Sequence, residues 1–81
     1  DVNRHVNSAK YLEWIIDSHP QEHLETKEIA SLEMSFLSEA MADDEVTVYS
    51  EESNGFELSN VRRTMDEKEL CRARLIWKTS G

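Results

Sequence analysis

Cysteine, proline and glycine are scarce in this sequence: its 81 residues include one Cys, one Pro and two Gly. The single thiol, Cys71, cannot form a disulfide within the chain, which fits a reducing compartment. Apolar runs are also short, and none approaches the roughly 18 residues that a membrane-spanning helix requires. Because 38% of the residues are hydrophobic, the sequence predicts one small domain with a thin apolar core.

Basic residues are few as well, and the formal net charge is −8. This charge disfavours nucleic acid or an anionic membrane as a partner. Residues 1–61 contain only Arg4, Lys10 and Lys27, whereas the region 62–78 contains Arg62, Arg63, Lys68, Arg72, Arg74 and Lys78. Two interpretations stay open for this basic region: solvated strand faces, or a docking patch for an acidic partner.

The first 18 residues pass from a polar pattern to a helical one. Asp1, Asn3 and His5 alternate, so on an extended segment their side chains point the same way. Asn7 and Ser8 are good N-cap residues for a helix that follows. The apolar stripe of this predicted helix consists of Ala9, Leu12 and Ile16, with Ile15 beside it.

The segment 19–28 is polar, and we expect a connecting loop there. Pro20 forces the residue before it out of the α region, which ends the first helix. His19 and His23 are four residues apart, a spacing that suits metal ligands on one helix, but Pro20 argues against a continuous helix. We therefore expect neither a metal site nor a cofactor.

Four strands are predicted after this loop, joined by short turns. The turn at 53–55 contains Asn-Gly, which favours a tight hairpin, and further turns are expected at 41–44 and 65–68. The predicted strands are residues 29–39, 45–52, 56–64 and 69–79. One helix followed by an antiparallel meander indicates an α+β fold.

Two of these strands carry clear alternation. The last strand directs its apolar residues inward (Cys71, Ala73, Leu75 and Trp77) and its basic residues outward, with Ile76 as an apolar exception. In the strand at 29–39, Ala30, Leu32, Met34 and Phe36 share one face. Leu37 breaks that pattern, and a bulge or strand end there would re-aim Glu39 inward.

Three segments resemble the acyl-acyl-carrier-protein (acyl-ACP) thioesterase family. Residues 1–14, DVNRHVNSAKYLEW, are similar to the family pattern DxNxHVNNxKYxxW and depart from it at Ser8, where the family usually has Asn. The segment LEMSFLSEA at 32–40 aligns with the family's LTLEYRREC without a gap. The ending ELCRARLIWK resembles the family's last strand, commonly EIVRARTEW.

This resemblance implies a hot-dog fold, in which one long helix packs on a curved antiparallel sheet. It further implies that residues 1–81 are the second, C-terminal hot-dog half of a double-hot-dog protein, a fragment in which the first strand is missing. An N-terminal hot-dog half would then be a partner that shapes the acyl pocket, and a homodimer stays open. We accordingly expect the isolated fragment to be inactive.

The resemblance also implies a catalytic set: Asp1, Asn3, His5 and Glu39. Glu39 would be the general base that activates water, and Asn3 would hold that water or polarise the carbonyl. His5 would orient Glu39 or relay a proton, and Asp1 would fix the geometry of Asn3 and His5. Where some members of the family have a cysteine next to the Glu, this chain has Ala40.

The implied function is hydrolysis of acyl-ACP, which releases free fatty acid in fatty acid biosynthesis. Acyl carrier protein would be the partner, docked on the basic patch Arg62, Arg63, Arg72, Arg74 and Lys78. The implied location is the bacterial cytoplasm, or the plastid stroma if the source is a plant. Two alternatives stay open: a non-catalytic hot-dog module that binds acyl chains or carriers, and an acyl-CoA thioesterase.

Overall fold

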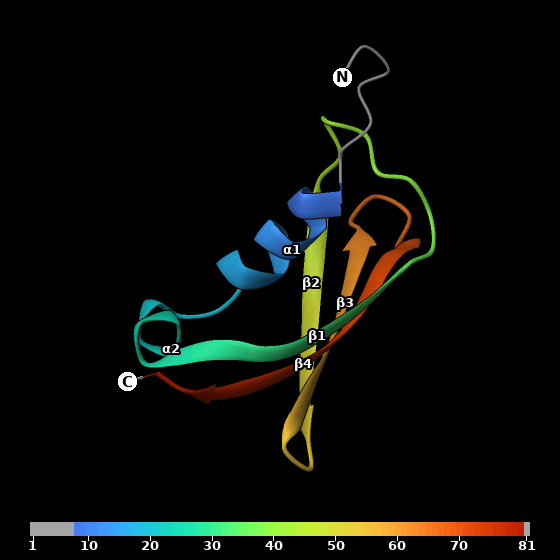
Figure 1. Cartoon of the computed structure of the whole chain (residues 1–81). Helices are drawn as coiled ribbons and strands as arrows, with labels where there is room; N and C mark the ends of the chain where they lie inside the picture. The colour runs from blue at the N-terminus through green and yellow to red at the C-terminus, as the bar shows by residue number, and fades with distance from the viewer. Residues whose placement is uncertain (1–7, 81) are drawn as a thin grey trace.

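The computed structural model describes residues 8–80, and residues 1–7 and 81 lie outside the described part of the chain. Three predicted site residues, Asp1, Asn3 and His5, therefore lie outside it. The described elements, in chain order, are α1 (Ser8–Asp17), α2 (Gln21–Thr26), β1 (Lys27–Phe36), β2 (Val46–Ser53), β3 (Phe56–Arg63) and β4 (Glu69–Thr79). Figure 1 shows them with these labels.

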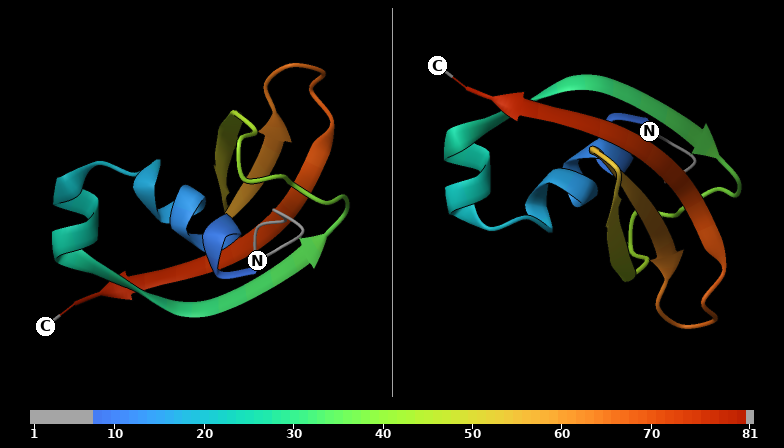
Figure 2. Two further views of the ribbon diagram at one scale, coloured as in Figure 1. Left: turned by 90° about the horizontal axis from the view of Figure 1, so that it is seen from above. Right: turned by 90° about the horizontal axis from the view of Figure 1, so that it is seen from below.

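The strands form one four-stranded sheet in the order β1-β4-β3-β2, and all neighbours are antiparallel. The sheet is strongly curved, and α1 lies on its concave side, as both views in Figure 2 show. The predicted α+β arrangement of a helix on a curved antiparallel sheet is confirmed, but the predicted meander is correct only for β2, β3 and β4, because β1 pairs with β4 and not with β2. Within residues 8–80, β1 and β2 are the edge strands.

The apolar core lies between α1 and the concave face of the sheet. Its fully buried side chains on the sheet include Val61 on β3 and Leu70, Cys71 and Leu75 on β4. The predicted alternation of β4 is confirmed, because Cys71, Ala73 and Leu75 are buried and Trp77 packs against the core from its edge. Neither helix within residues 8–80 has the length and apolar character needed to cross a membrane.

The buried face of α1 differs from the predicted stripe. Tyr11 and Ile15 are the buried residues of this helix, at 5% and 0% exposure, whereas Ala9 is exposed. The i, i+4 spacing places both on one face. A tyrosine can occupy a core position when its hydroxyl finds a hydrogen-bond partner, which pattern analysis of apolar residues alone does not anticipate.

The prediction of a loop at 19–28 is wrong, because α2 forms there. Pro20 occupies the N-cap of α2 in an extended conformation, with φ −66° and ψ 152°. Proline restricts the residue that precedes it, but it is well tolerated at the start of a helix. Pro20 therefore separates two helices rather than excluding the second.

The strand β1 is displaced relative to its predicted range. It begins at Lys27 and ends at Phe36, and its bulge lies between Ile29 and Ser31 instead of at Leu37. The bulge places Ala30 out of register, so Ile29 packs against the core in its place. The strand end before Leu37 does occur where the break in alternation indicated it.

The hairpin predicted at 53–55 is confirmed. Asn54 and Gly55 connect β2 and β3, with φ values of 42° and 87°. Two successive residues with positive φ are the geometry that Asn-Gly favours in tight hairpins.

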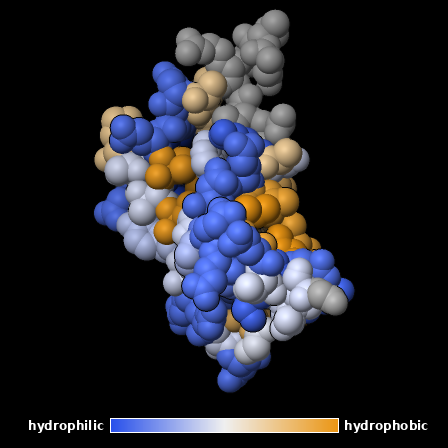
Figure 3. All heavy atoms as spheres, turned by 90° about the vertical axis from the view of Figure 1, so that its left-hand side faces the viewer, coloured by the Kyte–Doolittle hydropathy of each residue, from blue (hydrophilic) through white to orange (hydrophobic). Residues whose placement is uncertain are grey.

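Apolar surface also remains outside the core. Figure 3 shows hydrophobic surface on one face of the molecule, bordered by hydrophilic side chains. The exposed large apolar side chains are Phe36, Leu37, Tyr49, Leu58, Met65 and Ile76. Ile76 is thus the outward apolar residue that the alternation of β4 indicated.

Candidate active site

Glu39 lies in the irregular segment that follows β1, beside the first residue of α1. It is exposed, and it borders a groove of about 370 Å³. The other residues lining this groove are Ser8, Tyr11, Phe36, Leu37 and Ser38. The expectation that Glu39 turns inward is therefore not met, because Glu39 is exposed and borders an open groove rather than the closed core.

The backbone around Glu39 is held from two neighbouring elements. The N–H groups of Leu37 and Ser38 donate to the carbonyl of Leu70 at 2.9 and 3.3 Å. The Nη2 of Arg63 donates to the carbonyl of Glu39 at 3.2 Å. Although the segment has left the sheet, it is tied to the start of β4 and the end of β3.

Arg63 is itself fixed by two carboxylates. Its Nε lies 3.2 Å from Asp44 Oδ2, and its Nη1 lies 3.1 Å from Asp66 Oδ2. These hydrogen bonds raise the pKa of Arg63. The pKa of Asp66 is lowered, first by the backbone N–H of Lys68 and also by Arg63. Arg63 therefore bridges the turn that follows β3 and the Glu39 segment.

Tyr11 approaches the same segment from α1. Its hydroxyl oxygen lies 3.0 Å from the N–H of Ala40 and 3.4 Å from the carbonyl oxygen of Ser38. Ala40 is fully buried.

Cys71 is unsuited to act as a nucleophile. It is fully buried on β4, and its Sγ donates to the carbonyl of Arg72 at 3.6 Å. Burial raises the pKa of the Cys71 thiol to about 11, so the reactive thiolate is scarce at neutral pH. The prediction that this cysteine is buried is confirmed.

A second polar cluster was missed by the sequence analysis, and it is buried. Glu57 on β3 is 4% exposed. Its carboxylate lies 2.9 Å from His19 Nε2 and accepts hydrogen bonds from Trp77 Nε1 at 2.8 Å and Ser59 Oγ at 3.0 Å. Burial by itself raises the pKa of Glu57, but these hydrogen bonds outweigh it, and the pKa is lowered.

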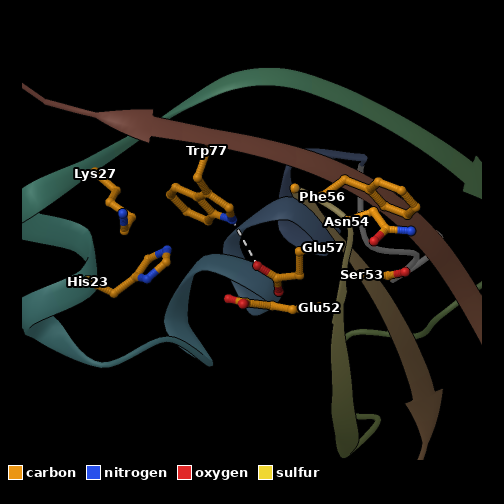
Figure 4. A pocket seen from close by; sticks show the side chains of 9 residues that line it. His23, Lys27, Glu52, Ser53, Asn54, Phe56, Glu57 and Trp77 are labelled. Carbon is orange, nitrogen blue, oxygen red and sulfur yellow. Dashed lines mark hydrogen bonds between the residues drawn. The ribbon is translucent and has the colours of Figure 1, made fainter.

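Figure 4 shows the surroundings of this carboxylate, with the Trp77 hydrogen bond drawn as a dashed line. The cavity next to it has a volume of about 350 Å³ and includes residues of α2 and of the hairpin between β2 and β3. His23 stacks on His19 with 4.9 Å between ring centroids, and its Nε2 is buried without a hydrogen-bond partner. Within residues 8–80, no three His, Cys, Asp or Glu side chains are grouped so that they could bind a metal ion.

One sequence signal could have indicated this cluster. Glu57 and Ser59 alternate with Leu58 and continue into Val61, so the period of two places them on the core face of β3. A carboxylate on a core face requires partners. Two of the partners, His19 between α1 and α2 and Trp77 on β4, come from elsewhere in the chain, and sequence spacing does not identify them.

The residues of the predicted basic patch lie in different surroundings. Arg72, Arg74 and Lys78 are outward residues of β4, with side chains 63%, 47% and 60% exposed. Arg63 is bound to Asp44 and Asp66 instead, with its side chain 19% exposed. The carboxylates paired with the three β4 cations belong to Glu69, Glu33 and Glu28, at 2.7, 3.5 and 3.2 Å.

Comparison with known proteins identifies the family that shares this sequence pattern and this fold. The sequence model described as the acyl-ACP thioesterase C-terminal domain matches residues 1–79. A chloroplastic acyl-[acyl-carrier-protein] hydrolase of Cuphea viscosissima is 36% identical and is matched over 96% of this chain and 20% of its own length. A chloroplastic palmitoyl-acyl carrier protein thioesterase of Cuphea hookeriana is 32% identical over the same shares of both chains.

Two solved structures agree with this match. An acyl-ACP thioesterase from Bacteroides thetaiotaomicron has a TM-score of 0.82 and 33% identity, over 96% of this chain and 32% of its own. The 12:0-ACP thioesterase from Umbellularia californica has a TM-score of 0.83 and 30% identity, over 99% of this chain and 30% of its own. The chain thus spans about one fifth of these curated relatives and about one third of the solved structures. It has the hot-dog fold and belongs to the acyl-ACP thioesterase C-terminal domain family.

Proposed function

We propose that this chain is the C-terminal hot-dog half of a thioester hydrolase that releases free fatty acid from acyl-ACP. The observation that carries the proposal is the position of Glu39, which borders a groove at the start of α1. That helix begins within the family pattern DVNRHVNSAKYLEW. The proposed catalytic residues Asp1, Asn3 and His5 precede the helix in this pattern.

In the proposed reaction Glu39 removes a proton from a water molecule, and the water oxygen attacks the thioester carbonyl carbon. Asn3 holds the water or polarises the carbonyl, and Asp1 keeps Asn3 and His5 in place. Backbone N–H groups at the start of α1 favour the negative charge of the tetrahedral intermediate. The carbon–sulfur bond then breaks, and the proton returns from Glu39 to the leaving thiolate, directly or through His5.

The surroundings of the thiol support water as the nucleophile. Ala40 follows Glu39 where some relatives in the family have a cysteine. Cys71 is fully buried on β4, with its pKa raised to about 11. A covalent acyl-cysteine intermediate would need an exposed thiolate, and Cys71 does not provide one.

The carrier protein is proposed to dock on the outward basic residues of the sheet. In our proposal Arg72, Arg74 and Lys78 contribute most, since all three are exposed, and Arg62 on β3 extends the same surface. Arg63 has a different task, because it holds the Glu39 segment. These exposed cations would attract the acidic surface of a carrier protein. Exposed charges of this kind act chiefly on the rate of association.

The remaining parts of the proposal concern the whole protein. An N-terminal hot-dog half shapes much of the acyl pocket, and the reaction belongs to fatty acid biosynthesis. The corresponding compartment is the cytoplasm in a bacterium and the plastid stroma in a plant. The names of the two Cuphea relatives place those proteins in the chloroplast.

The first test is Glu39→Gln in the full-length protein, assayed with acyl-ACP. Loss of a general base should lower kcat by about 10²-fold or more. Glu22→Gln on α2 is the matched control. It removes one exposed carboxylate from another element of the chain and should leave kcat unchanged. Full activity in Glu39→Gln would refute the proposed mechanism and favour a site without this carboxylate.

A second test separates acyl-ACP from acyl-CoA as the substrate. Reversing two exposed charges, Arg72→Glu with Arg74→Glu, should raise KM for acyl-ACP about tenfold and leave KM for the same acyl group on coenzyme A within about twofold. Equal effects on both substrates would contradict carrier docking on this surface. Binding of acyl-ACP without hydrolysis by the unaltered protein would favour the non-catalytic module instead.

A further inference from the structure

The phenol of Tyr11 bridges the two peptide groups that flank Glu39. The hydroxyl accepts a hydrogen bond from the N–H of Ala40 at 3.0 Å and donates one to the carbonyl of Ser38 at 3.4 Å. One side-chain atom therefore fixes the backbone immediately before and immediately after the proposed general base.

The position of this hydroxyl is set by packing rather than by solvent. Tyr11 is 5% exposed. Its ring meets Trp14 edge-on at 5.6 Å and Phe36 at 5.2 Å between ring centroids. The ring is thus held between α1 and the end of β1, and the hydroxyl has little freedom to move away from the Glu39 segment.

The other contacts that hold this segment come from different elements. The carbonyl of Leu70 receives the N–H groups of Leu37 and Ser38, and Arg63 donates to the carbonyl of Glu39. Tyr11 is the residue of α1 in this set. It therefore ties the Glu39 segment to α1, near whose start the other proposed catalytic groups and the helix N–H groups are expected.

We propose that Tyr11 is a positioning residue, whose hydroxyl sets the location of Glu39 relative to α1 and so sets kcat. This inference rests on the proposed function, in which Glu39 is the general base. In this role Tyr11 would act through the backbone around Glu39 and would not contact the reacting atoms. A displacement of about 1 Å in a catalytic group can cost as much as 10²-fold in rate, so loss of the bridge should be visible in turnover.

The test is Tyr11→Phe in the full-length protein, assayed with acyl-ACP and expressed per folded molecule. The variant keeps the ring contacts with Trp14 and Phe36 and removes only the hydroxyl. We expect kcat to fall at least tenfold with KM within about twofold, because substrate contacts are retained. Amide exchange at Ala40 should become faster, since its N–H loses its acceptor.

Ser18→Ala is the matched control for a merely structural effect. It removes one hydroxyl beyond the other end of α1, where Ser18 Oγ donates to the carbonyl of Ile15 at 2.6 Å. This variant should keep kcat within about twofold even if it is less stable. Unchanged kcat in Tyr11→Phe, or a variant that no longer folds, would overturn the positioning role.

A double-mutant comparison distinguishes this inference from the proposed function. If Tyr11 acts through Glu39, adding Tyr11→Phe to Glu39→Gln should lower kcat by less than about threefold further. An equal loss in both backgrounds would show that Tyr11 acts independently and would overturn the inference alone. If Glu39→Gln keeps full activity, the proposed function and the positioning role both fail.

Discussion

His19 Nε2 lies 2.9 Å from both carboxylate oxygens of Glu57, and the two side chains are only 10% and 5% exposed. The other ring nitrogen of His19 lies 2.8 Å from the carbonyl oxygen of Ile15. Both ring nitrogens of His19 thus lie within hydrogen-bond distance of oxygen atoms, which fixes the orientation of the ring. The pair connects the segment between α1 and α2 to β3, and Trp77 on β4 donates to the same carboxylate.

Replacing Glu57 by Gln should destabilise the fold. The amide keeps the volume of the side chain but removes the negative charge from the group that His19, Trp77 and Ser59 contact by hydrogen bonds. We expect the free energy of unfolding to fall by about 1–3 kcal/mol, the range for charge-assisted hydrogen bonds and unsatisfied buried groups. Urea denaturation measures it. The control is Glu52→Gln on the exposed end of β2, which should change stability by less than about 0.5 kcal/mol.

Glu57 should also make stability depend on acid pH. Its pKa is lower in the folded protein than the ordinary value of 4.5, so the unfolded chain takes up a proton first as the pH falls. The contribution of this carboxylate is therefore fully present above about pH 4.5 and is lost as the pH falls through the folded pKa. Denaturation midpoints measured from pH 7 to pH 3 should drop less in Glu57→Gln than in the unaltered protein. Parallel curves would show that other carboxylates cause the acid sensitivity.

Cys71→Ala should affect stability and spare the chemistry. Removing a buried sulfur leaves a small cavity between α1 and β4, which should cost about 1 kcal/mol. In the proposed full-length thioesterase, kcat should stay within about twofold. Because the pKa of this thiol is raised to about 11, a thiol-specific reagent should react slowly with the native protein at pH 8. Loss of turnover in a folded Cys71→Ala protein would reinstate a cysteine nucleophile.

Much of the fold could be predicted because its determinants are local. The alternation of β4, with Cys71 and Leu75 inward and Ile76 outward, follows from the period of a strand alone. The hairpin at Asn54 and Gly55 follows from backbone conformations that few other residue pairs accept. Strand ranges were correct to within a few residues for the same reason.

The errors arose where a tertiary contact decides the outcome. Tyr11 replaces Ala9 on the buried face because its hydroxyl is satisfied by the segment 38–40, about thirty residues later in the chain. The bulge next to Ala30 depends on the register between β1 and β4. Within the candidate site, Glu39 stays a prediction from the family pattern, and neither spacing nor periodicity indicated that Tyr11 and Arg63 contact the backbone around it.

The last prediction is that residues 1–81 alone will not work as an enzyme, although they would contain the proposed catalytic groups. The solved relatives are about three times longer than the part matched here. The proposed N-terminal half would shape the acyl pocket, so the isolated chain loses the substrate positioning that lowers the barrier. The edge strands β1 and β2 also leave backbone groups for association between copies.

The measurement compares acyl-ACP hydrolysis by residues 1–81 and by the full-length protein at equal concentrations of folded molecules. We expect no measurable turnover by the shorter chain, together with concentration-dependent association in sedimentation experiments. Adding the N-terminal half as a separate polypeptide should restore part of the activity if the two halves meet in one pocket. Turnover by residues 1–81 within about tenfold of the full-length protein would mean that the acyl site is complete within this chain, and the proposal of two cooperating halves would be wrong.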